Sequence, residues 1–248
     1  MTDGSQFDSL ADLYVDWSEL PFRQHLEFPS VLGLVGPVDG LRVLDLGCGS
    51  GVYSRKLAKA GATTVVGLDE SAGMLEYALR REAEEKLGIT YISGALPAEL
   101  RESFDLVLAV YVLPYARDYS QLLTLCQAAA EALRPGQRLL TLPIHPAVHT
   151  DPEYYSRYGM QIITSTPLAD AVPVGLNLRF GRYDAHVIPY YWTAATLERA
   201  LTEAGFTSIT WHLHRTADSG DVDAEFVQPY LDKPHAAIIE AIKAPRQA

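Results

Sequence analysis

The sequence predicts an α/β protein built on a doubly wound, mostly parallel β-sheet. Across most of the 248 residues, short apolar runs alternate with helical patterns, as a parallel sheet requires because helices must connect its strands. The run 43–51 (VLDLGCGSG) is a strand pattern that leads into an acidic residue and three glycines. A second apolar run, 65–69 (VVGLD), also ends in an acidic residue. Together these two runs predict a ligand site at the carboxyl ends of parallel strands.

The expected elements follow in a regular order. Helical patterns at 7–18 and 21–35 precede the sheet, and Pro21 is a residue type that begins helices. Five strands are expected at 42–46, 64–68, 90–93, 104–110 and 138–142, with a helix at about 119–133. After Pro143 the alternation breaks, and short β-like runs occur at 161–166, 177–180 and 185–190. A helix at 196–204, closed by Gly205, leads to two final strands at 208–214 and 236–243.

This order divides the chain into four expected parts. Residues 1–40 form helices that cap the site, and residues 41–142 form the ligand-binding core. Residues 143–192 are expected to form a lid that covers the substrate, because β-like runs alternate there with Pro and Gly breaks. Residues 193–248 complete the core sheet.

Charge and composition restrict the partners. The net charge is −11, from 20 basic and 31 acidic residues, which opposes binding to nucleic acid or to anionic lipid. No apolar run approaches the roughly 20 residues of a membrane span, and the first residues lack the form of a signal peptide. Two cysteines do not make a disulfide framework, so we expect a cytoplasmic protein.

The glycine-rich loop predicts a nucleoside-containing ligand. Gly47, Gly49 and Gly51 stand at alternate positions after Asp45, and glycine lets a ligand approach the backbone closely. An acidic residue about 20 positions after such a loop commonly binds ribose hydroxyls, and Asp69 is placed for that role. In the alternative interpretation, Asp69 only caps the next helix. That helix carries Met74, a soft side chain suited to an adenine face.

The spacing G-x-G-x-G resembles motif I of the class I S-adenosylmethionine-dependent methyltransferases. The run 7–14 (FDSLADLY), Phe104-Asp105 and the turn 133–136 (LRPG) resemble further motifs of that family. The resemblance implies a Rossmann-like sheet of seven strands with an antiparallel last strand and an insertion after strand five. The stretches 20–23, 109–116 and 204–211 resemble a narrower group, the bacterial small-molecule methyltransferases of secondary metabolism, including those of the toxoflavin pathway.

The resemblance also implies which residues bind the cofactor, S-adenosylmethionine, and its product S-adenosylhomocysteine. Tyr14 and Tyr111 are expected near the sulfonium, which aromatic faces stabilise. Arg23 is expected to pair with the methionine carboxylate, or alternatively to form a surface ion pair with Glu19 or Glu27. The family usually has an aspartate after strand three where this chain has Gly94, so the adenine edge is assigned to backbone groups here. The adenine-binding residues are then Ala95 and Leu96, with Leu96 covering the ring.

The expected chemistry is transfer of an already activated methyl group, in which positioning supplies much of the rate. His145 follows strand five at the ligand edge of the sheet and is our candidate general base; the alternative is a packed loop histidine. No set of metal ligands accompanies it, so no metal is expected. Aromatic side chains of the expected lid and of the end of strand four are candidates for contacting a planar substrate: Tyr115, Tyr183, Tyr191 and Trp192.

These observations predict a methyltransferase acting on an oxygen or nitrogen atom of a small aromatic or heteroaromatic secondary metabolite, as a monomer or homodimer. The alternative is an S-adenosylmethionine-binding enzyme that catalyses a non-methylating step such as cyclisation, because its cofactor site would be the same. A nicotinamide-dependent oxidoreductase is disfavoured because its third glycine lies one position later and no Tyr-x-x-x-Lys occurs.

Overall fold

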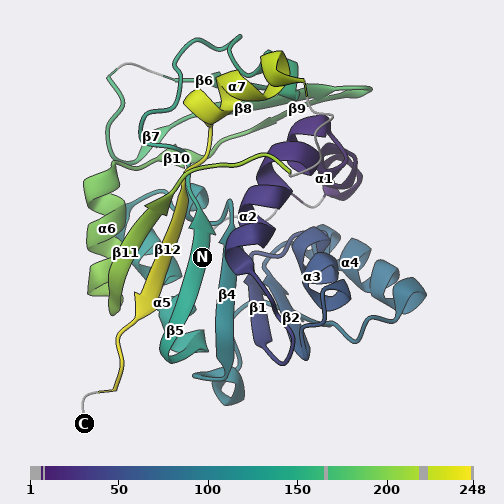
Figure 1. The fold of residues 1–248 in the computed structure, drawn as a ribbon, viewed down its shortest axis with the longest axis vertical. Helices are drawn as coiled ribbons and strands as arrows, with labels where there is room; N and C mark the ends of the chain where they lie inside the picture. Colours follow the sequence, from purple (N-terminus) through teal and green to yellow (C-terminus); the bar gives the residue numbers. More distant parts are fainter. Residues whose placement is uncertain (1–6, 8, 165–166, 218–222, 247–248) are drawn as a thin grey trace.

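The computed structural model describes residues 7, 9–164, 167–217 and 223–246. Its centre is a seven-stranded sheet with the order β11-β12-β5-β4-β1-β2-β3 (Figure 1). The strands are β1 (Arg42–Leu46), β2 (Thr64–Asp69), β3 (Thr90–Ser93), β4 (Phe104–Val110), β5 (Leu133–Leu142), β11 (Phe206–His212) and β12 (Ile238–Lys243). Strands β1 to β5 pair in parallel, whereas β12 is antiparallel to β5 and to β11. The predicted fold class, including the antiparallel last strand, is confirmed.

Helices cover both faces of this sheet because successive strand residues point to opposite sides. On one face, α2 (Phe28–Val35) and α3 (Val52–Lys59) pack against Val43, Val65 and Leu106. On the other, α5 (Tyr119–Ala132) and α6 (Ala194–Glu203) pack against Leu44 and Val66. The remaining helix within the core is α4 (Ala72–Glu85). The Ser71 hydroxyl caps its first turn by accepting the Met74 N–H at 3.3 Å.

The structure differs most from the sequence prediction at three elements. The first helix, α1, spans Ala11–Ser18 and so begins four residues later than expected. The second expected helix contains a π-helical segment, Arg23–Glu27, before α2. Strand β5 begins at Leu133 rather than 138, because Leu133 still pairs with Phe104 before the register shifts.

The insertion after β5 is rich in β-structure, as predicted. Strands β6 (Met160–Ile163), β8 (Gly175–Phe180) and β9 (Tyr183–Val187) form an antiparallel sheet, and β7 (Val172–Pro173) pairs with β10 (Tyr190–Tyr191). The expected run 161–166 ends at residues that lie outside the described part. The helix α7 (Ala224–Asp232), absent from the sequence prediction, lies beside the β6-β8-β9 sheet, beyond the carboxyl ends of β1, β4 and β5 (Figure 1).

A third apolar core joins this insertion to the rest of the molecule. It contains Leu13 and Trp17 of α1, Tyr155 and Leu178 of the insertion, and Tyr230 of α7. The ligand edge of the sheet is therefore covered by three segments that are far apart in the sequence. Within the described residues, no helix is both long and apolar enough to cross a membrane.

Candidate functional site

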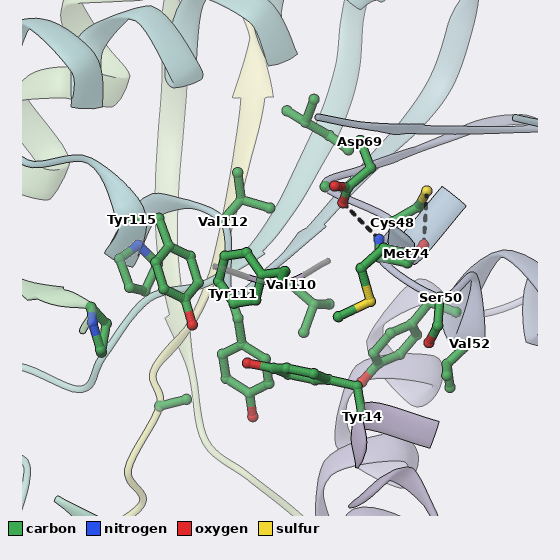
Figure 2. A pocket seen from close by; sticks show the side chains of 18 of the residues that line it. Tyr14, Cys48, Ser50, Val52, Asp69, Met74, Val110, Tyr111, Val112 and Tyr115 are labelled. Carbon is green, nitrogen blue, oxygen red and sulfur yellow. Dashed lines mark hydrogen bonds between the residues drawn. The ribbon is translucent and has the colours of Figure 1, made fainter. Parts of the chain in front are cut away.

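A pocket lies at the carboxyl ends of β1, β2 and β4, and Figure 2 shows the side chains around it. Strands β1 and β4 are neighbours whose following connections run in opposite directions across the sheet, which is where parallel α/β sheets bind ligands. The cavity measures about 240 Å³. One part of its wall comes from the glycine loop, β2 and α4. The facing part comes from α1, the end of β4 and the insertion.

The glycine loop has a backbone that only glycine adopts without strain. Gly47 and Gly49 have φ values of +66° and +52° and line the pocket. A Cβ atom on Gly47 would lie 2.5 Å from Cγ2 of Val112, so a side chain there would clash. Gly51 does not line the pocket; it precedes α3, and a Cβ on it would lie 2.3 Å from the Tyr91 hydroxyl. Its φ of +76° and this close contact beneath the loop both favour glycine at this position.

Asp69 links the loop to α4. Its Oδ2 accepts the Gly49 N–H at 2.7 Å, and its Oδ1 accepts the Ser71 N–H at 2.8 Å (Figure 2 shows the first). Burial raises the pKa of this carboxyl group, and the backbone hydrogen bonds oppose that effect. Asp69 therefore orders the loop and the start of α4 while it still lines the pocket. Asp69 thus caps α4 and lines the pocket at the same time, and its binding to the ribose stays a prediction.

A second carboxyl group, Asp45, lies beneath the loop. It is 2% exposed, and its Oδ2 accepts the Ser54 hydroxyl at 2.5 Å. Burial is the largest effect and raises the pKa of Asp45 to about 7, with the neighbouring Asp69 adding to the increase. With Glu70 also in the wall, this end of the pocket is acidic.

Arg23 is the cation of the pocket. Its Nε lies 3.0 Å from Oε1 of Glu27, and both side chains are buried. The Arg23–Glu27 ion pair is thus an interior contact, not the surface pair considered from the sequence. Glu27 also accepts the Tyr53 hydroxyl at 2.8 Å and the Tyr111 hydroxyl. Arg23 stacks over Trp17, with its guanidinium carbon 4.5 Å from the ring centroid, and it lines the pocket. Its pairing with the methionine carboxylate stays a prediction.

Aromatic side chains form the wall opposite the glycine loop. Tyr14, Tyr111 and Tyr115 all line the cavity (Figure 2), and Met74 lies beside Gly49. Burial raises the pKa of Tyr14 to about 12, so its phenol is neutral at physiological pH. Tyr111 has φ of +59°, a strained value for a bulky residue, and such strain gathers at functional sites.

Several other predicted site residues lie outside the pocket wall. Trp192 is 3% exposed and packs in the main core with α6. Tyr191 is buried and donates to the Pro146 carbonyl at 2.8 Å, and Tyr183 donates to Asp16 at 2.6 Å. Tyr183 and Tyr191 thus bind other parts of the chain, Trp192 packs in the main core, and none of the three lines the cavity.

The residues predicted to bind the adenine ring and to act as the general base also lie outside the pocket wall. Ala95 is exposed and Leu96 packs against the main core, and neither lines the cavity. His145 does not line it either, although its neighbour Ile144 does; its Nδ1 accepts the Ala147 N–H at 3.0 Å. Burial and the nearby Lys233 lower the pKa of His145. The structure therefore corresponds to the packed loop histidine considered as the alternative.

The histidine that does line the pocket is His235, which the sequence prediction missed. It stands three residues before β12, and because β12 is antiparallel its start lies at the ligand edge. The sequence feature that could have indicated this residue is the dipeptide Pro234-His235 shortly before an antiparallel last strand. No group of three or more metal-ligating side chains occurs among the residues with described coordinates.

Comparison with known proteins identifies the family. A family model described as "Methyltransferase domain" matches residues 43–136. The structure of an S-adenosylmethionine-dependent methyltransferase from Mesorhizobium loti superposes with a TM-score of 0.61 at 26% identity, covering 88% of this chain and 97% of that one. The demethylmenaquinone methyltransferase of Lactococcus lactis is 30% identical over 217 residues, which span 84% of this chain and 83% of that protein. The chain belongs to the class I S-adenosylmethionine-dependent methyltransferases.

Two further proteins resemble this chain less completely. The ubiquinone biosynthesis O-methyltransferase of Brucella anthropi is 31% identical to this chain over 175 residues, which span 70% of this chain and 62% of that relative. The [4+2]-cyclase SpnF shares the fold alone, with a TM-score of 0.54 and 19% identity over 96% of this chain and 82% of that one. The family thus fixes the cofactor class, and the acceptor must be argued from the pocket.

Proposed function

We propose that this methyltransferase transfers a methyl group from S-adenosylmethionine to an oxygen or nitrogen atom of a small aromatic or heteroaromatic metabolite. The observation that carries the proposal is the composition of the pocket beyond the cofactor loop. There the described residues of the insertion and of the end of β5 that line the cavity are all apolar, namely Ile144, Ile162, Val174, Leu176 and Pro189. A flat apolar acceptor gains the most from burial against such a wall.

The residues present fit the cofactor. The side-chain-free Gly47 and Gly49 leave the loop backbone open to a ligand, and the Asp69 carboxylate can accept from hydroxyl groups. The guanidinium of Arg23 lines the cavity and can pair with a carboxylate. When bound, S-adenosylmethionine supplies a methyl group already activated on sulfonium, so the chain itself needs only to position, desolvate and orient the acceptor.

The names of the relatives support the acceptor class. Two of them act, by name, in ubiquinone biosynthesis and on demethylmenaquinone, and quinones are planar rings that bear oxygen. The acidic net charge of −11 argues against nucleic acid as the acceptor. We propose a cytoplasmic enzyme that requires no metal and acts as a monomer or homodimer.

The test measures release of S-adenosylhomocysteine by the full chain with defined probes. We expect 2,3-dihydroxynaphthalene (oxygen) or lumazine (ring nitrogen) to be methylated at least tenfold faster than decalin-2,3-diol, which has the hydroxyls without the aromatic ring. Consumption of a probe without S-adenosylhomocysteine would favour the cyclase-type alternative. No turnover of either aromatic probe by an enzyme that binds S-adenosylhomocysteine would contradict the acceptor class.

A variant of the insertion localises the acceptor site. Leu176 lines the cavity, so Leu176→Ser should raise KM for the methylated probe by roughly tenfold, because about 2 kcal/mol of apolar contact is lost. The matched control is Asn177→Ala, the next residue on β8, whose side chain points to the other face and binds His186 at 2.7 Å. Equal KM values in both variants would place the acceptor elsewhere.

A further inference from the structure

His235 is held firmly at the ligand edge of the sheet. Its carbonyl accepts the His145 N–H at 2.8 Å, and the Ala237 N–H donates to the Pro143 carbonyl at 2.9 Å. These bonds and the bridge between Ile144 and Ala236 extend the β5–β12 pairing by one step. The backbone of His235 is therefore fixed relative to β5, directly beside the pocket.

The imidazole ring is enclosed by aromatic rings from four segments. The ring centroids of Phe22, Tyr111, Tyr155 and Tyr230 lie 5.5 to 6.1 Å from it. His235 is 5% exposed, and it contributes to the pocket wall. The ring can therefore neither rotate away nor be hydrated freely, which fixes the direction of its polar atoms.

The hydroxyl of Tyr230 determines which ring nitrogen carries the proton. It lies 2.8 Å from Nδ1 of His235, and Tyr230 is fully buried on α7. Among the described residues the hydroxyl has no other hydrogen-bond partner, so its proton is satisfied only by donation to Nδ1. Burial raises the pKa of Tyr230 well above its usual range, so this proton is retained. Nδ1 is then an acceptor, and Nε2 carries the imidazole proton.

The surroundings also keep the ring neutral. Burial is the largest effect, and it lowers the pKa of His235 well below its usual value; His214, Arg23 and His145 add repulsion. Nε2 has no hydrogen-bond partner within the described part of the chain, although it is not among the fully buried unpaired polar atoms. The hydroxyl of Tyr111, its neighbour in the wall, already donates to Glu27.

We propose that His235 is a positioning and specificity-determining residue whose Nε2–H donates a hydrogen bond to a carbonyl or other lone-pair oxygen of the acceptor. This inference rests on the proposed function and deepens it. In this tautomer His235 cannot act as a general base, because Nε2 already holds a proton and Nδ1 is occupied by Tyr230. The acceptor therefore carries an oxygen acceptor group in addition to the atom that is methylated.

The first measurement determines the tautomer directly. Long-range ¹H–¹⁵N spectra of the ¹⁵N-labelled full chain with S-adenosylhomocysteine at pH 7.5 should show His235 with an unprotonated Nδ1 and a protonated Nε2. The signals are assigned by their absence in His235→Gln. Tyr230→Phe should shift the Nδ1 signal, because its donor is removed. A protonated Nδ1, or a doubly protonated ring, in the wild-type protein would overturn the proposal.

The second measurement tests recognition, with 1-tetralone as the carbonyl probe and tetralin as its match without oxygen. For each protein loaded with S-adenosylhomocysteine, the ratio of the Kd for tetralin to the Kd for 1-tetralone measures the preference for the carbonyl. This ratio should be roughly tenfold lower in His235→Phe than in the wild type, because the variant lacks one hydrogen bond to the probe. His235→Gln keeps a donor and should retain most of that preference. An unchanged preference in His235→Phe overturns the role of His235 alone, whereas failure to bind S-adenosylhomocysteine contradicts the proposed function itself.

Discussion

Asp45 shows how a single residue under the glycine loop makes stability depend on pH. Its pKa is about 7 in the folded chain and 3.8 for the free side chain, so between these values the folded state holds one more proton than the unfolded state. Its contribution to the free energy of unfolding therefore falls as pH rises, by up to about 1.4 kcal/mol per pH unit. The cause is the charge that must form in a buried position.

Asp45→Asn should remove this dependence. Urea unfolding at several pH values between about 4 and 7 should give a flatter profile for the variant than for the wild type, because an amide does not titrate. The amide oxygen can still accept the Ser54 hydroxyl, so the loop need not rearrange. The control is Glu76→Gln on the exposed side of α4. Parallel profiles for wild type and Asp45→Asn would show that Asp45 ionises without cost.

At the same scale, the sequence predicted the positions of those pocket residues that are set by local backbone. Gly47 and Gly49 lie in the loop after β1, and Asp69 is the last residue of β2, so their neighbours in sequence are also their neighbours in space. His235 was missed because its position depends on the antiparallel return of β12 beside β5. Trp192 was misplaced because aromatic residues of an insertion fill either its own core or a pocket, and only packing decides between them.

At the scale of elements, the π-helical segment Arg23–Glu27 joins the N-terminal helices to the pocket. The extra residue in its turn puts Arg23 and Glu27 on the inner side, where Glu27 binds hydroxyls from α3 and from the end of β4. Strand positions and the main helices were predictable because each has a clear apolar period. The helix α7 was not, because it packs against the insertion. The π-helical turn was not, because its buried Arg23 and Glu27 bind groups of α1, α3 and the end of β4.

Glu27→Gln tests this junction. The change leaves the buried guanidinium of Arg23 without its counter-charge, so we expect a loss of about 3–5 kcal/mol in the free energy of unfolding at pH 7, measured in urea. The control is Glu19→Gln, an exposed acid just before the same segment, which should change stability by less than about 0.5 kcal/mol. A loss below about 1 kcal/mol for Glu27→Gln would mean that the tyrosines and Trp17 compensate the cation by themselves.

At the scale of the whole molecule, the pocket is closed by segments from the N-terminus, the insertion and the C-terminus that share one apolar core. A ligand in the pocket therefore contacts the glycine loop of the sheet and also the helices that cover it. Removal of the expected lid, 143–192, would expose that shared core. Binding of the cofactor should therefore raise the stability of the complete chain, and not of the sheet alone.

Thermal unfolding with S-adenosylhomocysteine measures this linkage. At about 100 times its Kd the ligand adds about 2.7 kcal/mol to the free energy of unfolding, which corresponds to a rise in Tm of roughly 5–10 °C for a chain of this size. Asp69→Ala should remove most of the rise at the same concentration, because it removes the carboxylate that we assign to the ribose. NAD is the matched control: it carries the same adenosine, but its pyrophosphate would bring negative charge into a pocket whose wall holds Asp69 and Glu70. If NAD raised Tm as much as S-adenosylhomocysteine does, the acidic end of the pocket would not be what selects the cofactor.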